Sequence, residues 1–198
     1  YDVFVVDELD EFLYRYAEFN HKVIFAAEQY CWPVDNAEEQ KALVSKHFTD
    51  LDTKYKYLNS GVFIGRVSEL KKIFKDPIEN DGDDQLYCQK KYLSEKYDIV
   101  IDTDCYMFQC HEAEVYPRKG LLFNPNTRCY NLLYHGNGGQ DAKQKLNQLY
   151  TNFSFSSSPI VLTITHKYDK LDDDILLIDY LTPSMCDSLI ELSERHGG

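Results

Sequence analysis

The sequence predicts an α/β fold, and three observations support this prediction. Short apolar runs such as residues 22–27 are typical of strands buried in a parallel sheet. Amphipathic stretches such as residues 8–19 are typical of helices that cover a sheet. Runs of the two kinds alternate along the chain, which indicates layers of helix packed on sheet.

The first half of the chain contains the clearer elements. In order, we expect a strand at 1–6, a helix at 8–19, a strand at 22–27, a helix at 36–47, a strand at 57–65 and a helix at 67–75. Asn36 is a suitable cap for its helix, because Glu39 stands at the capping-box position three residues later. Pro77 would stop the helix at 67–75.

The second half continues the same pattern. We expect a helix at 84–96, strands at 98–102 and 105–109, a loop-rich stretch at 111–129, a strand at 131–134 and a helix at 141–151. The serine-rich stretch 154–158 is typical of a linker. After it, strands at 159–166 and 174–179 and a helix at 184–195 begin a second unit. We therefore expect one domain at 1–153, a linker at 154–158 and the beginning of another domain at 159–198.

Composition excludes several classes of function. A net charge of −12 argues against nucleic acid or an anionic membrane as the main partner. We find no signal peptide and no apolar run long enough to span a membrane. The chain opens directly in a strand and ends just after a helix, so we interpret it as an internal fragment of a longer protein.

Six cysteines and one sequon favour the secretory pathway. The cysteines show no zinc-type spacing, and Cys105 and Cys110 are near enough in sequence to form a disulfide across a turn. Asn152-Phe153-Ser154 matches the acceptor motif for N-glycosylation.

Three carboxylates in five residues, Asp81, Asp83 and Asp84, are the most informative local feature. They stand before a helix, where a carboxylate complements the helix dipole, but this explains one of them more easily than all three. Asp2 and His135 are the best candidates to ligate a hard cation such as Mn²⁺ or Mg²⁺. We expect the glycine loop after His135 to leave its imidazole exposed enough to reach a metal; the alternatives are a surface aspartate and a turn histidine.

The glycine in Asn59-Ser60-Gly61 interrupts a strand. Such a glycine indicates a bulge or a close approach to another group, for example a ligand. Trp32, the only tryptophan, could cover the face of a base or sugar, and packing in the core explains it equally well.

Four segments in a fixed order carry a specific resemblance: Phe25-Ala-Ala-Glu-Gln-Tyr-Cys-Trp-Pro33, Tyr57-Leu-Asn-Ser-Gly-Val-Phe-Ile-Gly65, Asp81-Gly-Asp-Asp-Gln-Leu-Tyr87 and Tyr134-His-Gly-Asn-Gly138. Together they resemble the glycosyltransferase domain of the procollagen lysyl hydroxylase/glycosyltransferase family. The resemblance covers residues 1–153 and implies the C-terminal half of a GT-A-like domain. The stretch 175–190 resembles the entry to the family's hydroxylase domain.

The resemblance implies an activity and its ligands. The transferase would move a sugar from a UDP-sugar to hydroxylysine of a collagen-like polypeptide, with Mn²⁺, in the endoplasmic reticulum lumen. Fe²⁺, 2-oxoglutarate and ascorbate would serve only the missing hydroxylase part, because no His-x-Asp motif occurs here. The family pattern also allows a homodimer of the parent protein, without nucleic acid and without a membrane span.

The resemblance also implies roles for individual residues. The residues implied in each role are Asp2 and His135 for the metal, Tyr1, Trp32, Asn59, Asn137, Gly138 and Lys143 for substrate binding, and Asp83 and Asp84 for catalysis. Lys143 matches the family only if two residues are inserted after Gly139.

Two departures limit the implied activity. The family's metal site includes an aspartate three residues before the position of Asp2, upstream of this chain, and the preceding nucleotide-binding strands are missing as well. We therefore expect the chain by itself to be inactive. Two alternatives stay open, a non-catalytic transferase-like accessory domain and a glycogenin-like glucosyltransferase.

Overall fold

A computed structural model describes most of the first 152 residues. The described ranges are 2–20, 22–33, 38–42, 53–76, 83–111, 113–118 and 121–152. The elements are β1 (Val3–Val5), α1 (Leu9–Glu18), β2 (Val23–Glu28), β3 (Tyr57–Ile64), α3 (Val67–Ile73), α4 (Asp84–Leu93), β4 (Ile99–Asp102), β5 (Phe108–Cys110), β6 (Tyr116–Arg118), β7 (Leu121–Asn124), β8 (Cys129–Asn131), β9 (Leu133–His135) and α5 (Gln140–Asn152). Residues 38–42 are also helical.

Several expectations fall outside these residues. Tyr1, Asp81, the linker at 154–158 and the segment at 159–198 with its resemblance to a hydroxylase domain lie outside the described part of the chain. They stay predictions.

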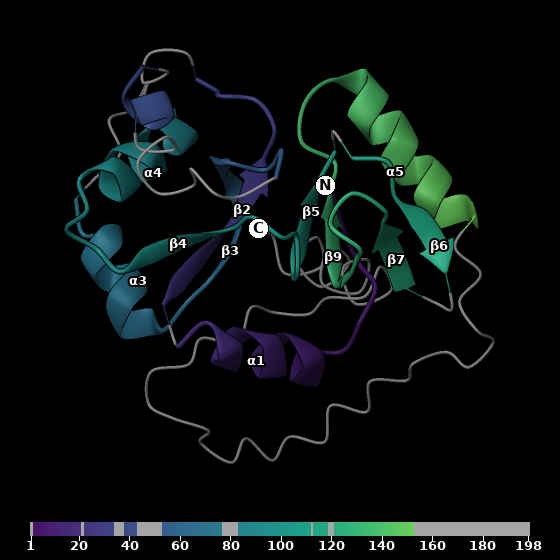
Figure 1. Cartoon of the computed structure of the whole chain (residues 1–198), viewed down its shortest axis with the longest axis horizontal. Coiled ribbons are helices and arrows are strands. Elements are labelled where there is room, and N and C mark those ends of the chain that lie inside the picture. Colours follow the sequence, from purple (N-terminus) through teal and green to yellow (C-terminus); the bar gives the residue numbers. More distant parts are fainter. Residues whose placement is uncertain are drawn as a thin grey trace, which may run out of the picture.

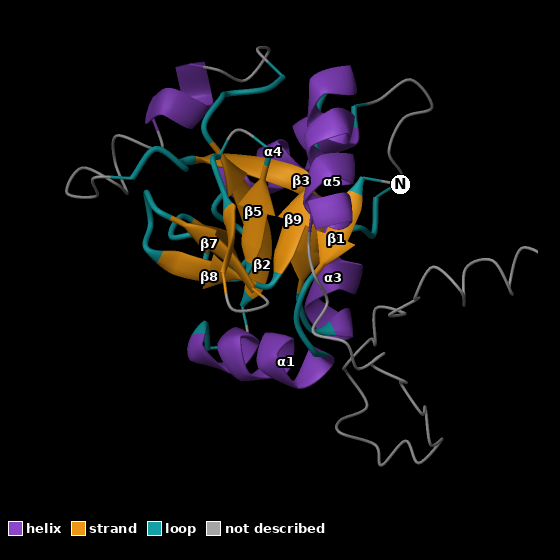
Figure 2. Ribbon diagram, turned by 90° about the vertical axis from the view of Figure 1, so that its right-hand side faces the viewer, coloured by secondary structure: helices purple, strands orange, loops and turns teal. Residues whose placement is uncertain are grey.

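The strands form three small sheets with helices around them (Figures 1 and 2). Their orders are β3-β2-β4, β1-β9-β5 and β6-β7-β8. β2 runs parallel to β4 and antiparallel to β3, while β9 runs parallel to β5 and antiparallel to β1. β2 and β5 contact each other, so the first two sheets lie side by side. The prediction of a mixed α/β fold is confirmed.

β2 lies at the centre of the core because its sequence is almost entirely apolar. All six of its residues are buried, and Ile24, Phe25, Ala26 and Ala27 are completely inaccessible. Alternate side chains point to opposite faces of a strand, and those of β2 accordingly join two different hydrophobic clusters. A strand buried on both faces is what the apolar run at 22–27 predicts.

The expected loop at 111–129 is wrong in part. It contains the strands β6 and β7 and the start of β8, which pair in an antiparallel sheet. β6 is exposed along its whole length, so it lacks the alternation of apolar and polar residues that identifies a half-buried strand. The strand expected at 105–109 begins later, at Phe108, because residues 103–107 form turns and bends.

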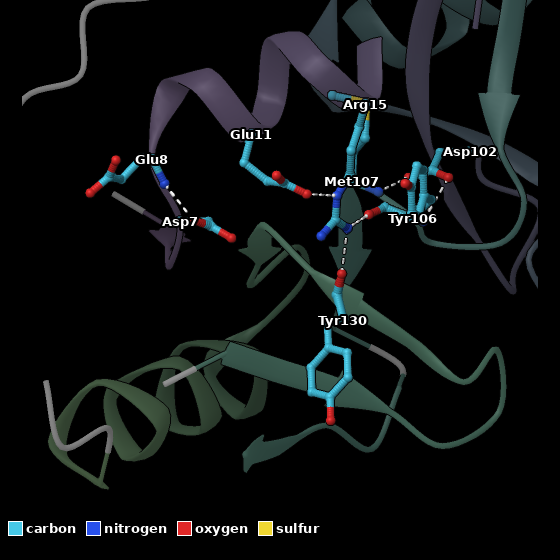
Figure 3. A network of polar contacts seen from close by, with 8 residues as sticks. All are labelled: Asp7, Glu8, Glu11, Arg15, Asp102, Tyr106, Met107 and Tyr130. Atoms are coloured by element: carbon cyan, nitrogen blue, oxygen red, sulfur yellow. Dashed lines mark hydrogen bonds and ion pairs between the residues drawn. The ribbon is translucent and has the colours of Figure 1, made fainter. Parts of the chain in front are cut away.

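The turn between β4 and β5 is held from two sides (Figure 3). Asp102 accepts hydrogen bonds from the backbone N–H groups of Tyr106, Met107 and Phe108 at 2.7–2.9 Å. Arg15 of α1 donates to the carbonyl oxygens of Tyr106 and, at 2.6 Å, Tyr130. These contacts fix the start of β5 relative to α1 and β8.

Asp102 is fully buried, and burial raises its pKa to about 6 although the three N–H donors act in the opposite direction. Arg15 is also buried, and its guanidinium pairs with Glu11 at 2.7 Å and lies over the Tyr106 ring. The Arg15 guanidinium thus binds the Glu11 carboxylate and two backbone carbonyl oxygens at the same time.

The disulfide that the spacing of Cys105 and Cys110 would allow is not formed. Both thiols are free and buried, as is that of Cys88, while Cys31 and Cys129 are free and partly exposed. Nearness in sequence does not set the Cα separation and Cβ directions that a disulfide requires. Burial instead raises the pKa of Cys105 well above its ordinary value.

Within the part of the chain that the structure describes, no helix has the length and apolar character needed to cross a membrane.

Candidate functional site

Asp2 and His135 meet beside the sheet β1-β9-β5. His135 ends β9, the central strand, and pairs with Val3 of β1 and Cys110 of β5. The N–H of Gly136 donates to the carbonyl oxygen of Asp2 at 2.6 Å. Held in this register, Asp2 Oδ2 lies 3.5 Å from His135 Nε2. The two predicted metal ligands, 133 positions apart in the sequence, are therefore neighbours.

Gly61 makes room for the His135 imidazole. A Cβ on Gly61 would lie 2.1 Å from His135 Cε1 and 2.6 Å from Nε2, well inside van der Waals contact. The pairing of β2 with β3 shifts register between Phe25 and Ala26, whose partners are Phe63 and Asn59, so residues 60–62 bulge from the ladder. Both interpretations of the strand glycine, a bulge and a close approach, are thus correct, but the approaching group belongs to the protein.

His135 is less exposed than we expected. Its side chain is 7% exposed, whereas that of Asp2 is 45% exposed. The imidazole is buried because it packs against Gly61 of β3 and does not extend into the glycine loop. Only the edge that carries Nε2 faces Asp2.

A chain of hydrogen bonds begins at Asn137, two residues after His135. Asn137 Oδ1 accepts from the N–H of His111 at 2.8 Å, and its Nδ2 donates to Glu28 Oε2 at 3.2 Å. Gln85 Nε2 donates to the other carboxylate oxygen of Glu28 at 2.6 Å. Glu28 therefore joins the loop after β9 to the first turn of α4.

Glu28 was not identified as a site residue by the sequence. It is the last residue of β2, it is 4% exposed, and both of its carboxylate oxygens accept hydrogen bonds from amide groups. A carboxylate at the end of a buried apolar strand is the signal that could have found it, since acidic side chains are rarely buried without a reason.

Asp83 and Asp84, in the acidic cluster at the start of α4, make different contacts. Asp83 is the N-cap, and its Oδ1 accepts the N–H of Leu86 at 2.9 Å. Asp84 instead accepts from the Ser60 hydroxyl, Oδ2 to Oγ 3.3 Å, at the bulge of β3. Both residues are exposed. The carboxylate of Asp84 therefore faces the bulge that holds His135, while that of Asp83 is directed to the helix backbone.

Trp32 lies beyond the end of β2 and is 58% exposed, so it is not a core residue. Its carbonyl oxygen accepts from the side-chain amides of Gln85, at 2.6 Å, and Gln89. The indole is therefore presented at the surface from a backbone tied to α4. The neighbouring Tyr30 is 66% exposed.

The other predicted residues surround this centre. Asn59 is buried and accepts the N–H of Gly61 at 3.0 Å, so its side chain shapes the bulge. Gly138 has φ +108°, a backbone conformation that favours glycine. Lys143 is exposed in the first turn of α5, where its N–H donates to the Gly139 carbonyl.

The donor set of Asp2 and His135 fits a hard divalent cation. Two adjacent ligands of an ion such as Mg²⁺, each about 2.1 Å from it, lie about 3 Å apart, which is near the observed 3.5 Å. No group of three or more His, Cys, Asp and Glu side chains that could hold a metal occurs among the described residues. Within the described ranges, Asp2 and His135 could therefore supply two ligands, and phosphate oxygens and water would have to supply the others.

The chain is similar to a protein family and to several known proteins. The family described as the PLOD GT domain matches residues 1–158. An uncharacterised protein, R699, of Acanthamoeba polyphaga mimivirus is 34% identical over 154 residues, which cover 75% of this chain and 32% of that protein.

Two animal relatives carry descriptive names. Procollagen-lysine,2-oxoglutarate 5-dioxygenase of Drosophila melanogaster is 32% identical over 70% of this chain and 20% of its own length. Multifunctional procollagen lysine hydroxylase and glycosyltransferase LH3 of Homo sapiens is 30% identical over 75% of this chain and 21% of its own length. The chain thus spans about a third or less of the relatives it matches.

Proposed function

The chain belongs to the PLOD GT domain family, and we propose that its site transfers a sugar from a UDP-sugar to hydroxylysine in a collagen-like polypeptide. This proposal is based mainly on the contact between Asp2 and His135. Nearby, hydrogen bonds connect Asn137 to Glu28 and Glu28 to Gln85. A glycogenin-like transferase would share single features of this site, but the family match favours the procollagen-related reaction.

In this proposal Asp2 and His135 bind Mn²⁺ together with the diphosphate of the donor. The bound ion would neutralise the charge that develops on the leaving diphosphate. His135 is held rigidly by β9 and by its contact with Gly61, so its Nε2 needs no rearrangement to serve as a ligand. Preorganised groups of this kind act without a reorganisation cost during the reaction.

The remaining side chains would orient the donor sugar. Asn137 lies next to His135 in the loop after β9, and Gly138 leaves space for the diphosphate there. Trp32 and Tyr1 would contact the nucleotide, Asn59 would hold the bulge beneath the sugar, and Lys143 would pair with phosphate. Glu28, fixed by two amides, adds a negative charge that can stabilise a positively charged sugar ring.

The transfer itself exchanges one C–O bond for another. The bond from the anomeric carbon to the phosphate oxygen breaks, UDP leaves, and the hydroxylysine oxygen bonds to that carbon. The hydroxyl proton must pass to a base, and a carboxylate near the bulge can accept it. We assign this work to Asp84, because Asp83 is engaged in capping α4.

The wider setting is part of the same proposal. The parent protein would also carry a lysine hydroxylase domain that uses Fe²⁺, 2-oxoglutarate and ascorbate, act in the lumen of the endoplasmic reticulum, and form a homodimer. The names of two relatives support the hydroxylase part of this setting: one is a procollagen-lysine,2-oxoglutarate 5-dioxygenase, and the other is a multifunctional procollagen lysine hydroxylase and glycosyltransferase.

Transfer assays on the full-length protein that carries this chain test the proposal. UDP-galactose and UDP-glucose are supplied with a hydroxylysine-containing collagen peptide, with and without Mn²⁺, and the glycosylated peptide is measured by mass spectrometry. We expect Mn²⁺-dependent product with one of the donors and none from the His135→Ala variant.

A protein that binds UDP with Mn²⁺ but forms no product with any hydroxylysine peptide would instead be a non-catalytic transferase-like domain. Absence of both binding and product would overturn the proposed function.

A further inference from the structure

A second feature of α4 lies toward the end opposite the candidate site. A shallow, open cavity of about 330 Å³, whose walls are mostly apolar, is lined by Tyr87, Lys90, Lys91, Ser94, Lys96 and Tyr97. Because α4 runs from Asp84 to Leu93, its far end is about 14 Å along the helix axis from the proposed catalytic carboxylate. The cavity shares no lining residue with the site described above.

Lys91, in the wall of the cavity, is held by several contacts. Lys91 pairs with Asp76 at 2.7 Å, and its Nζ lies 4.9 Å from the ring centre of Tyr87 and 5.4 Å from that of Tyr97. The Tyr87 hydroxyl donates to the carbonyl oxygens of Ile73, at 2.7 Å, and of Asp76. Lys91 is therefore already fixed and mostly neutralised, and the hydrogen bond to Asp76 raises its pKa.

Two further lysines remain available to a ligand. Lys90 and Lys96 are exposed, and neither pairs with a carboxylate among the residues that the structure describes. In the sequence, Lys90 precedes and Lys96 follows the end of α4 at Leu93. Lys75 adds positive charge nearby, since it helps to lower the pKa of Asp76.

We propose that this cavity binds a small phosphate or sulfate monoester. Lys90 and Lys96 match the charge of one such group, while the tyrosine rings and the lysine methylenes provide apolar surface for the carbon skeleton of the ester. The volume is at the small end of ligand sites. A long polyanion is disfavoured, because the acidic surface of the rest of the chain would repel it.

Titration calorimetry at low ionic strength tests this inference with four probes: glucose 6-phosphate, glucose 6-sulfate, inorganic phosphate and glucose. We expect one of the two esters to bind best, inorganic phosphate to bind more weakly because it has no carbon skeleton to pack on the tyrosines, and glucose not to bind. The comparison of the two esters identifies which anion the site prefers.

Matched variants locate the binding. Lys90→Ala with Lys96→Ala should weaken ester binding by up to about 25-fold, because each substitution removes one charge-assisted hydrogen bond from an exposed position, worth up to about fivefold in affinity. Lys54→Ala with Lys71→Ala removes the same charge from two exposed positions outside the cavity and should have little effect. All four lysines are exposed, so the fold should be kept, which thermal unfolding checks.

The result is separable from the proposed transferase function. Ester binding should persist in His135→Ala and in the presence of saturating UDP and Mn²⁺. Absence of ester binding, equal weakening by both lysine pairs, or displacement of the ester by UDP would each overturn the second site, and none of these results would affect the transferase proposal.

Discussion

The imidazole of His135 lies directly on the backbone of Gly61. A Cβ at position 61 would come within 2.1 Å of His135 Cε1. The His135 ring, from one sheet, can therefore pack on β3 of the other sheet only because residue 61 has no side chain. Without a glycine at this point of β3, the histidine could not keep both its place in β9 and its approach to Asp2. The relationship yields the first two predictions.

Gly61→Ala should displace His135 and destabilise the domain. Forcing an extra methyl group into a packed region costs about 1–3 kcal/mol, and the displaced imidazole would leave Asp2. We expect a lower unfolding midpoint in urea and weaker Mn²⁺-dependent UDP binding. Gly139→Ala is the matched control, because a Cβ there meets nothing within 4 Å. Equal effects at both positions would contradict the steric explanation.

His135→Ala should weaken the binding of UDP with Mn²⁺ without unfolding the domain. The variant removes a proposed metal ligand, so the affinity for UDP with Mn²⁺ should fall at least about tenfold, as measured by titration calorimetry. The double variant with Gly61→Ala should unfold at a higher urea concentration than Gly61→Ala alone, because the added methyl group no longer meets a ring. It should still fail to bind UDP with Mn²⁺. Unchanged affinity in His135→Ala would assign this residue a purely structural role.

Asp83→Ala and Asp84→Ala should differ from each other. Asp83 caps α4, so its loss should lower the free energy of unfolding by about 1 kcal/mol, and Asp83→Ser should restore most of this stability. Asp84→Ala should leave stability almost unchanged and reduce sugar transfer about 10²–10⁴-fold, the usual range for a general acid or base. Transfer rates that fall equally in Asp83→Ser and Asp84→Ala would contradict the division of roles.

Asp102 should make the stability of the domain depend on pH. Its folded pKa, about 6, lies above the ordinary value of 3.8, so folding takes up a proton between these values. The free energy of unfolding should therefore fall as pH rises from 4 to 6, by up to about 3 kcal/mol from this group. Urea unfolding at several pH values should show a flatter profile for Asp102→Asn. An identical profile in both proteins would show that Asp102 ionises with its ordinary pKa.

Much of the fold follows from local sequence patterns. The apolar run of β2, the amphipathic helix α1 and the capped start of α4 are each encoded within about ten neighbouring residues, and each occurs where it was predicted. The end of α4 was placed three residues too far along the chain, at 96, because the sequence Ser94-Glu95-Lys96 does not itself forbid a helix. Glu95 ends it with a positive φ of 53°.

The short strands β6, β7 and β8 could not be predicted in the same way. Each has three or four residues, too few for a period to be recognised, and each is defined by its hydrogen bonds to a neighbouring strand. The free thiols of Cys105 and Cys110 show the same limit, since their spacing in sequence says nothing about the direction of their side chains.

The sequence by itself determined that this is an α/β domain, which strand is buried on both faces, and which motifs carry the resemblance to the family, because these features depend on neighbouring residues. The tertiary structure alone decided which distant groups meet. Glu28 and Asn137, which form a hydrogen bond, are 109 positions apart. The contact between Gly61 and His135 is evident only once β3 and β9 have been placed in the fold. Such contacts depend on the packing of whole sheets, which no local pattern of residues specifies.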